Sequence, residues 1–178
     1  MKNLSEEYAS ALYELAEENS LEDIISEQMK ELSAILEDNA EYVKLLDNPS
    51  IEKKQRTELA LEAFGDAQEY LKNFIMLLVE SRRMSEFAGC TAHFLHLYDD
   101  KHGIIRAEAV TATALDSIQS EKIKTQLEAK TGKKVILTNT VDSSLIGGVL
   151  LKYGTKQIDM SIRTSLSSIS EMIANADI

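Results

Sequence analysis

The stretch VDSSLIGGVLLKYG, residues 141–154, is the most specific part of this 178-residue sequence. Two adjacent glycines, Gly147 and Gly148, interrupt an apolar run that ends at Lys152 and Gly154. An interior glycine weakens a strand and is usually there for geometry. The stretch therefore predicts a strand with a bulge or a close backbone approach at the glycine pair.

The sequence before this stretch predicts two further strands. Apolar and polar residues alternate over 104–113 and again over 135–141, and Thr and Val, which favour strands, are frequent in both segments. Asp142 and the two serines that follow it supply the chemistry of a turn between the second and third strands.

Two helices complete this part of the chain. One is expected over residues 117–131, between the first two strands, with Gly132 closing it. The other is expected after the third strand, capped by Asp159 or Ser161. Residues 105–178 thus predict a small α+β domain, whose strands are too few to be stable without the helices.

Residues 1–104 predict an antiparallel bundle of six helices with short connections, so the chain as a whole is expected to be mainly α. Ser20 and Ser85 are expected to cap the second and sixth helices. Gly65 is expected to end the fourth helix in a left-handed conformation. Asp66, with a glutamate three residues later, has the spacing of a capping box for the fifth helix.

The expected fifth helix, residues 70–81, is apolar around most of its circumference. Such a helix is either central to a bundle or packed against two neighbours. The first helix carries the small residues Ala9, Ala11 and Ala16. Small side chains beside large ones either belong to a well-filled core or leave a groove that accepts an amphipathic partner helix, and both interpretations stay open at this point.

The charge of the chain is divided unevenly between its two parts. Residues 1–104 hold 10 Lys and Arg against 22 Asp and Glu, a net of −12, whereas residues 105–178 hold 9 against 8, a net of +1. The overall net charge of −11 disfavours nucleic-acid backbones and anionic lipid, which an acidic surface repels. The 44% hydrophobic and 28% charged residues are typical of an ordinary globular protein.

The sequence predicts a protein that stays in the compartment where it is made. No run approaches the roughly 18 apolar residues of a membrane span. The chain leads from Met1 into an acidic helix without a secretory or transit segment. The single cysteine, Cys90, cannot form an intrachain disulfide, which is consistent with a reducing cytosol.

Spacing excludes the two glycine motifs as nucleotide-binding loops, and no cofactor is expected. A phosphate loop needs a glycine five residues before its Gly-Lys pair, and Leu127 stands at that distance from Gly132. The pair Gly147-Gly148 lacks the G-x-G-x-x-G spacing and precedes no helix N-terminus.

Cys90, His93 and His96 follow one another at steps of three and are all residue types that bind zinc. Six residues of one helix rise about 9 Å, so Cys90 and His96 cannot both reach an ion held at about 2 Å. We interpret them as a buried cysteine and two ordinary helix histidines, and expect no metal site. No nucleophile and base can be paired from spacing either, and the many carboxylates are most simply solvated helix faces.

Several segments, taken in this order, form a recognisable set: YASALYELA (8–16), NPSI (48–51), the Phe64-Gly65 pair, NFIMLLVESRR (73–83), GIIRAEAVTA (103–112), TGKKV (131–135), the glycine stretch (141–154) and IDMSIR (158–163). The set resembles the delta subunit of bacterial F-type ATP synthases, a family related to the mitochondrial oligomycin-sensitivity-conferring protein. The resemblance covers essentially the whole chain, and the glycine stretch resembles the family's signature closely.

The resemblance implies a non-catalytic stator subunit that links the catalytic head to the peripheral stalk and resists rotor torque during proton-driven ATP synthesis. In this family, a face of the first and fifth helices binds the N-terminal helix of an alpha subunit. Carried onto this sequence, that face includes Tyr8, Ala11, Leu12, Asn73, Leu77 and Glu80. The domain over 105–178 would meet the C-terminal end of the b subunit, so that each domain has its own partner.

The resemblance also implies one copy per complex, peripheral at the cytoplasmic face of the bacterial plasma membrane and held there by protein contacts. The signature positions expected to shape the C-terminal domain are Gly147, Gly148, Lys152, Gly154, Asp159 and Arg163. The chain departs from the family at Ser143, where Pro is frequent, and at Met160 and Thr164, where Gly is frequent.

Two other functions compete with the stator. A helical adaptor could share the bundle and serve other partners. A zinc-dependent or thiol enzyme centred on Cys90 and His93 predicts stoichiometric metal, or loss of activity on Cys90→Ala, and we expect neither.

Overall fold

A computed structural model describes residues 4–145, 147–154 and 156–161 of the chain. The chain divides into two compact units, Met1–Tyr98 and Asp99–Ile178. Helices predominate, and a small sheet lies in the second unit, so the predicted fold class, a helical bundle followed by a small α+β domain, is confirmed. Within the described ranges, no helix has the length and apolar character needed to cross a membrane.

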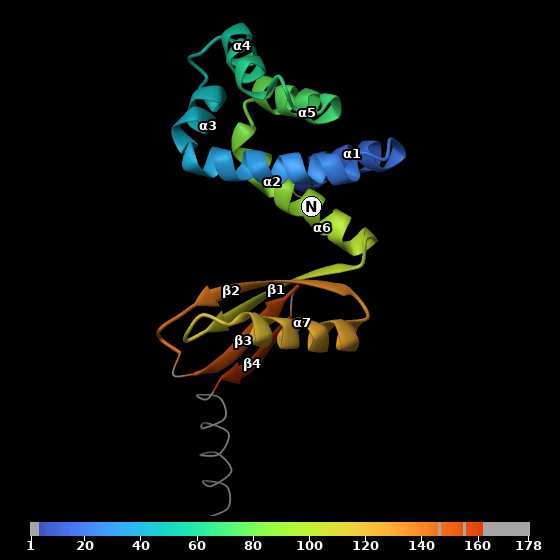
Figure 1. Cartoon of the computed structure of the whole chain (residues 1–178). Coiled ribbons are helices and arrows are strands. Elements are labelled where there is room, and N and C mark those ends of the chain that lie inside the picture. The colour runs from blue at the N-terminus through green and yellow to red at the C-terminus, as the bar shows by residue number, and fades with distance from the viewer. Residues whose placement is uncertain (1–3, 146, 155, 162–178) are drawn as a thin grey trace, which may run out of the picture. The chain divides into compact units, whose positions relative to one another are not determined.

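The first unit is built from helices joined by short connections (Figure 1). They are α1 (Leu4–Glu18), α2 (Glu22–Asp38), α3 (Ala40–Asp47), α4 (Lys53–Phe64), α5 (Glu69–Glu80), the 3-10 turn η1 (Met84–Glu86) and α6 (Phe87–Lys101). Each helix from α1 to α6 lies where the hydrophobic spacing predicts one, and α6 runs on into the second unit.

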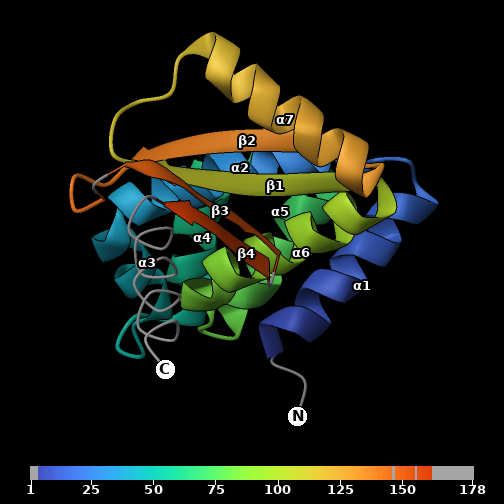
Figure 2. The same ribbon diagram turned by 90° about the horizontal axis from the view of Figure 1, so that it is seen from below.

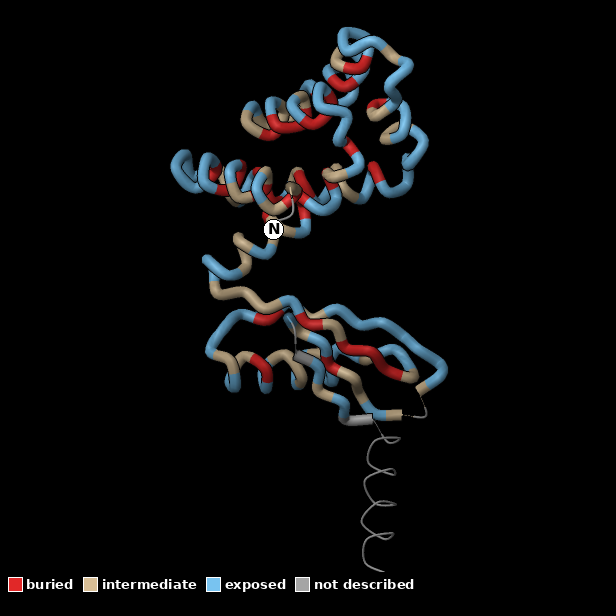
Figure 3. Tube along the Cα trace, turned by 180° about the vertical axis from the view of Figure 1, so that it is seen from behind, coloured by how far each residue is buried: buried red, intermediate tan, exposed pale blue. Residues whose placement is uncertain are grey.

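Helix α5 is central to the core of the bundle. Its Leu71, Ile75 and Leu78 are each 0% exposed, and the cluster around them includes buried residues from every other helix of the unit. Figure 3 marks these buried stretches in red on the inner sides of the helices. A helix that is apolar nearly all round therefore does occupy the centre, which is one of the two settings that its sequence predicts.

Helix α1 ends in a Schellman motif whose left-handed residue is a serine. Ser20 has a φ of 55°, and its N–H donates to the carbonyl of Glu17. The N–H of Leu21 donates to the carbonyl of Ala16, which completes the pattern. The prediction that Ser20 caps α2 is therefore wrong, because this residue ends the preceding helix, and Leu21 at the start of α2 makes no side-chain cap.

Helix α5 ends in the same way at an arginine. Arg82 has a φ of 55°, and its N–H donates to the carbonyl of Val79. The N–H of Arg83 donates to the carbonyl of Leu78. Left-handed backbone is uncommon outside glycine, so in both helices the two closing hydrogen bonds hold a residue that does not favour the conformation.

Three further helix ends differ from their predictions. Gly65 has a right-handed φ of −59°, and the glycine is needed for space, because a Cβ there would lie 2.7 Å from the carbonyl oxygen of Leu61. The N-cap of α5 is Gln68, whose side chain accepts from two backbone N–H groups, in place of Asp66. Ser85 lies inside η1 and does not cap α6.

The backbone N–H groups at the start of η1 donate hydrogen bonds to a carboxylate of another helix. Asp47, the last residue of α3, accepts from the backbone N–H of Met84 at 2.7 Å and of Ser85 at 2.9 Å. This contact joins residues 37 and 38 positions apart in the chain. Spacing along the sequence could not have identified it.

The corner between α3 and α4 is held from inside by Arg56, which is 1% exposed. Its Nη1 donates to the carbonyl of Ile51 at 2.7 Å and, more weakly, to that of Asn48 at 3.4 Å. The Asn48 side chain accepts from the N–H of Ser50 at 2.8 Å. The NPSI segment is therefore a hydrogen-bonded corner built around a buried cation.

The second unit holds a four-stranded sheet in the order β2-β1-β3-β4. Its elements are β1 (Ile104–Thr111), α7 (Ser117–Thr131), β2 (Lys134–Val141), β3 (Gly148–Tyr153) and β4 (Lys156–Ser161). β1 and β2 are parallel and joined through α7, whereas β3 is antiparallel to both β1 and β4. A parallel pair needs a crossover connection, and α7 supplies it.

Helix α7 covers one face of this sheet and lies against β2 (Figure 2). Leu127 of α7 packs with Ala107, Ala109, Val135 and Leu151, which are the buried residues of the sheet cluster. Asp116 and Gln119 form a reciprocal capping box at the start of α7. Gly132, with a φ of 69°, closes the helix as predicted.

The sheet has one strand more than the sequence predicts. The sequence offers Asp159 or Ser161 as the cap of a final helix, and Asp159 is wrong because it lies inside β4. The expected final helix, together with Arg163, lies outside the described residues. The apolar residues of the IDMSIR segment fit the spacing of a strand as well as that of the start of a helix.

The two glycines of the signature stretch mark the entry to β3. Gly147 and Gly148 have φ values of 157° and 90°, so they do adopt conformations that other residues avoid. The register runs without an inserted residue from Val149 to Tyr153 against β1 and from Gly148 to Tyr153 against β4, so the predicted bulge is absent from these paired residues. The turn before it is formed as predicted, because Asp142 Oδ1 accepts from the N–H of Ser144 at 2.9 Å.

Candidate partner-binding surface

Helices α1 and α5 pack against each other in opposite directions. The ring of Tyr8 meets that of Phe74 edge-on, with centroids 6.5 Å apart. Further along, the hydroxyl of Tyr70 and the side-chain oxygen of Asn19 are hydrogen-bonded at 3.3 Å. Because Tyr70 is at the start of α5 and Asn19 follows α1, the end of α1 lies beside the start of α5.

Exposed, mostly apolar side chains lie on both of these helices. Leu77 of α5 is 46% exposed and Leu15 of α1 is 43% exposed. Ala11 and Asn73 are exposed as well, and Tyr8 is half-buried. We name these five residues the α1–α5 strip. Since a helix turns about 100° per residue, the three on α1 share one side of that helix, as the two on α5 do on theirs.

The remaining predicted partner-binding residues lie in other settings. Leu12 is 3% exposed and packs in the bundle core, so it is not itself available to a partner. Glu80, at the end of α5, forms an ion pair with Lys53 at 2.9 Å. Leu15 was not assigned to this face from the sequence, although its position four residues after Ala11 is the signal that would have found it.

Cys90, His93 and His96 all lie on α6, where Cys90 is buried. Burial raises the pKa of Cys90 to about 11, with a further contribution from the charge of Glu86, so its thiol stays protonated at neutral pH. The rings of His93 and His96 stack with centroids 6.4 Å apart. Over the described part of the chain, no three Cys, His, Asp or Glu side chains are grouped as metal ligands.

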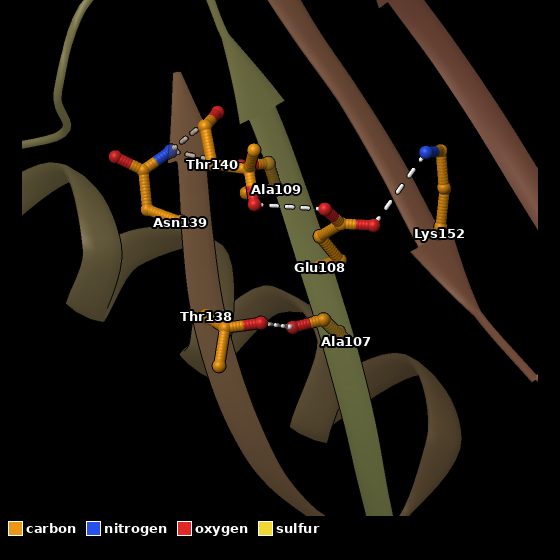
Figure 4. A network of polar contacts seen from close by, with 7 residues as sticks. All are labelled: Ala107, Glu108, Ala109, Thr138, Asn139, Thr140 and Lys152. Atoms are coloured by element: carbon orange, nitrogen blue, oxygen red, sulfur yellow. Dashed lines mark hydrogen bonds and ion pairs between the residues drawn. The ribbon is translucent and has the colours of Figure 1, made fainter. Parts of the chain in front are cut away.

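A polar network lies on the sheet face opposite α7 (Figure 4). Glu108, in the middle of β1, accepts a hydrogen bond from the hydroxyl of Thr140 at 2.8 Å and forms an ion pair with Lys152 at 3.5 Å. These contacts, that of Thr140 first, lower the pKa of Glu108. The signature residue Lys152 therefore lies in a cross-strand network that spans β2, β1 and β3.

This network borders a small hollow of about 260 Å³, lined also by Arg106 and Gly154. Arg106 forms a two-pronged ion pair with Asp99, with Nε at 2.6 Å and the second nitrogen at 2.9 Å. Gly154 has a φ of 55° at the turn between β3 and β4. Both cations beside the hollow, Arg106 and Lys152, already have carboxylate partners.

The sequence profile of the family described as "ATP synthase delta (OSCP) subunit" matches residues 4–173 of this chain. A protein of Propionigenium modestum named "ATP synthase subunit delta, sodium ion specific" is 37% identical over 166 residues, which cover 92% of this chain and 94% of the relative. The "ATP synthase subunit delta" of Lactobacillus gasseri is 35% identical over 173 residues, covering 97% and 95%.

Among solved structures, the fold is similar to that of a chain in the cryo-EM structure of the Toxoplasma gondii mitochondrial ATP synthase hexamer. The TM-score is 0.77 at 19% sequence identity, and the match covers 97% of this chain and 98% of that one. At this identity the likeness concerns the fold. It extends over both units of the chain.

Proposed function

This chain belongs to the ATP synthase delta (OSCP) subunit family and is a subunit of an ATP synthase, and on that premise we propose that it is the non-catalytic stator piece joining the catalytic head to the peripheral stalk. The observation that carries the proposal is the α1–α5 strip, an exposed apolar line on a bundle whose interior is already filled. A torque-resisting link needs slow dissociation from two partners and no reactive group.

The first partner in this proposal is the N-terminal helix of an alpha subunit, bound along the α1–α5 strip. Leu15 and Leu77 are large apolar residues, and nearly half of the surface of each is exposed to water. A helix laid in the seam between two helices can cover such residues with its own apolar stripe. The half-buried Tyr8 adds an aromatic contact of the kind that often contributes much of the binding energy at an interface.

The second partner in this proposal is the C-terminal end of the b subunit, bound by the second unit. Residues 105–178 have a net charge of +1 against −12 for residues 1–104, so the two surfaces suit different partners. The sheet face opposite α7 presents a polar ladder across its strands, with Glu108 at the centre. Such a face offers hydrogen bonds and charge to a partner, and little apolar area.

In this account the protein is present once per complex, at the cytoplasmic face of the bacterial plasma membrane, and it is held there by its protein partners. It requires no cofactor or metal. A helical adaptor with other partners is the alternative. Cross-linking in native membranes distinguishes the two, because an adaptor would give products that contain neither alpha nor b subunits.

The direct test is titration of the full chain with a peptide of the alpha-subunit N-terminal segment from the same organism. We expect binding at about 10 µM peptide or below. Leu77→Asp should weaken it at least about tenfold, because a carboxylate would be buried in an apolar contact. Ile35→Asp is the matched control, since Ile35 is 54% exposed on α2, away from the strip. Absence of detectable wild-type binding would refute this half of the proposal.

A further inference from the structure

The α1–α5 strip has an acidic border along α1. Viewed down the axis of α1, the side chains of Glu7, Glu14 and Glu18 point within about 60° of the direction of Ala11. They lie on the side of Ala11 that is away from Leu12. All three glutamates are exposed. The apolar residues of the strip thus lie on one side of Ala11, and a row of carboxylates lies on the other.

These carboxylates have no cation to neutralise them within the described part of the chain. Helix α1 contains five glutamates and neither Lys nor Arg. By contrast, Glu80 on the α5 side of the strip is paired with Lys53 at 2.9 Å. Glu80 is therefore neutralised within the protein, whereas Glu7, Glu14 and Glu18 on α1 are not.

The same carboxylates conflict with the local preferences of the helix. Glu18 is the last residue of α1, and Glu14 stands one turn before it. The C-terminal end of a helix carries a partial negative charge, which disfavours carboxylates there and favours Lys or Arg. A local rule that is broken without a compensating contact is most common at functional positions.

We propose that the α1–α5 strip takes an amphipathic helix whose apolar stripe is bordered by Lys or Arg on the edge that faces α1. This inference rests on the proposed function, since it assigns the chemistry of the segment that binds the same strip. It is carried by charge complementarity, because a basic edge would neutralise Glu7, Glu14 and Glu18 while the apolar stripe covers Leu15 and Leu77.

The spacing of the glutamates sets the spacing of the basic residues. Glu7 and Glu14 are about 10.5 Å apart along the axis of α1, and Glu14 and Glu18 about 6 Å. A helix that lies along α1 matches these intervals with basic residues about two turns and about one turn apart. A partner with a single cation would leave most of the border uncompensated.

The experiment is a titration of the full chain with the alpha-subunit N-terminal peptide, comparing Glu7→Gln, Glu14→Gln and Glu18→Gln. Each substitution should weaken binding about two- to fivefold, the size expected for one exposed ion pair. Raising salt from about 0.1 M to about 1 M shortens the screening length from about 10 Å to about 3 Å, and should weaken the wild type more than the triple variant.

Glu17→Gln is the matched control on the same helix. Glu17 is exposed but lies about 120° around α1 from Ala11, beyond the row of three, so this substitution should leave the affinity unchanged. Thermal melting supplies a second readout, because Glu18→Gln should raise the melting temperature of the free protein while it weakens binding. If Glu18 had only a structural role, its substitution would not raise the melting temperature and weaken peptide binding at the same time.

The outcomes separate this inference from the proposed function. If the wild type binds and the three variants bind equally well, or if binding does not depend on salt, the inference of a basic edge is wrong. The proposal of a stator subunit is unaffected by that result. Absence of wild-type binding would overturn the premise as well. Weakening by Glu17→Gln as strong as by Glu14→Gln would show that only overall charge matters, and would also overturn the inference.

Discussion

The two units of the chain bury their apolar side chains to very different extents. The cluster of buried residues in the bundle holds 19 residues, among them Phe64, Phe74, Phe87 and Phe94. The corresponding cluster in the sheet unit holds 5 of the described residues, none of them aromatic. Because burial of apolar area is the main stabilising term, the described part of the bundle gains more from it than the described part of the sheet unit.

This difference in cores matches a difference in surfaces. The bundle presents an apolar strip with an acidic border, whereas the sheet presents a polar ladder whose charges are paired within the protein. A well-filled unit can leave large apolar residues such as Leu77 exposed without losing its fold. We expect the bundle to be a stable platform for its partner and the sheet unit to gain more of its stability from binding.

The largest expected effect comes from emptying the core of the bundle. Phe94 is 0% exposed and meets the ring of Tyr13 with centroids 5.2 Å apart. Phe94→Ala should cost about 3–5 kcal/mol, and Leu127→Ala in the sheet unit about 2–3 kcal/mol because its site is less enclosed. Hydrogen exchange during denaturant unfolding measures the two units separately. Equal losses in both units would contradict the comparison.

The next effect concerns the long-range contact of Asp47. Asp47→Ala removes the acceptor for the N–H groups of Met84 and Ser85 and should cost about 1–2 kcal/mol. Asp47→Asn keeps one acceptor oxygen and should recover part of this loss. Chemical denaturation of the variants measures both, and an unchanged midpoint for Asp47→Ala would refute the capping role.

A smaller effect, opposite in sign between the units, is expected at the left-handed residues. In the bundle, Ser20→Gly and Arg82→Gly should each stabilise by about 0.5–1 kcal/mol, because glycine adopts this backbone freely. In the sheet unit, the left-handed residue that ends α7 is Gly132, and Gly132→Ala should destabilise the protein by about 1 kcal/mol. Melting temperatures test all three, and destabilisation by Ser20→Gly would contradict the account.

The smallest expected effect is a pH dependence at the sheet face. The pKa of Glu108 is lowered in the folded state, so its contribution to stability is present above its unfolded pKa and is lost as the pH falls through its folded pKa. Thr140→Val and Lys152→Met should each raise this pKa, since each removes a contact that stabilises the charged carboxylate. Carboxyl NMR titration measures both, and an unchanged pKa in Thr140→Val would refute this assignment.

Much of the fold could be predicted from the sequence because its signals are local. Helix α7 lies where the spacing and Gly132 place it, and α5 is central because it is apolar nearly all round. The small residues of α1 and the apolar circumference of α5 also mark these two helices in the sequence, although they leave open whether the residues fill a core or form a groove. These features depend on residues close together in the chain, which a pattern can detect.

The features that the sequence did not predict are of two kinds. Some depend on contacts between residues far apart in the chain, and others place a residue type in a setting where it is uncommon. Asp47 serves η1 from another helix, and Arg56 is buried although its type is usually exposed. Ser20 and Arg82 hold left-handed backbone where glycine is the usual signal. Within the candidate site, exposure separates Leu15 from Leu12, although both are leucines on one side of α1.

Reconstitution shows whether this chain bridges the catalytic head and the peripheral stalk. Purified catalytic head lacking this chain is mixed with the soluble part of the b subunit, with and without the chain, and the masses of the assemblies are measured. We expect head and stalk to associate only when the chain is present. Leu77→Asp should leave the chain bound to the stalk alone, and Ile35→Asp should behave as wild type. Equal association of head and stalk without the chain, or bridging unaffected by Leu77→Asp, would contradict the proposed function.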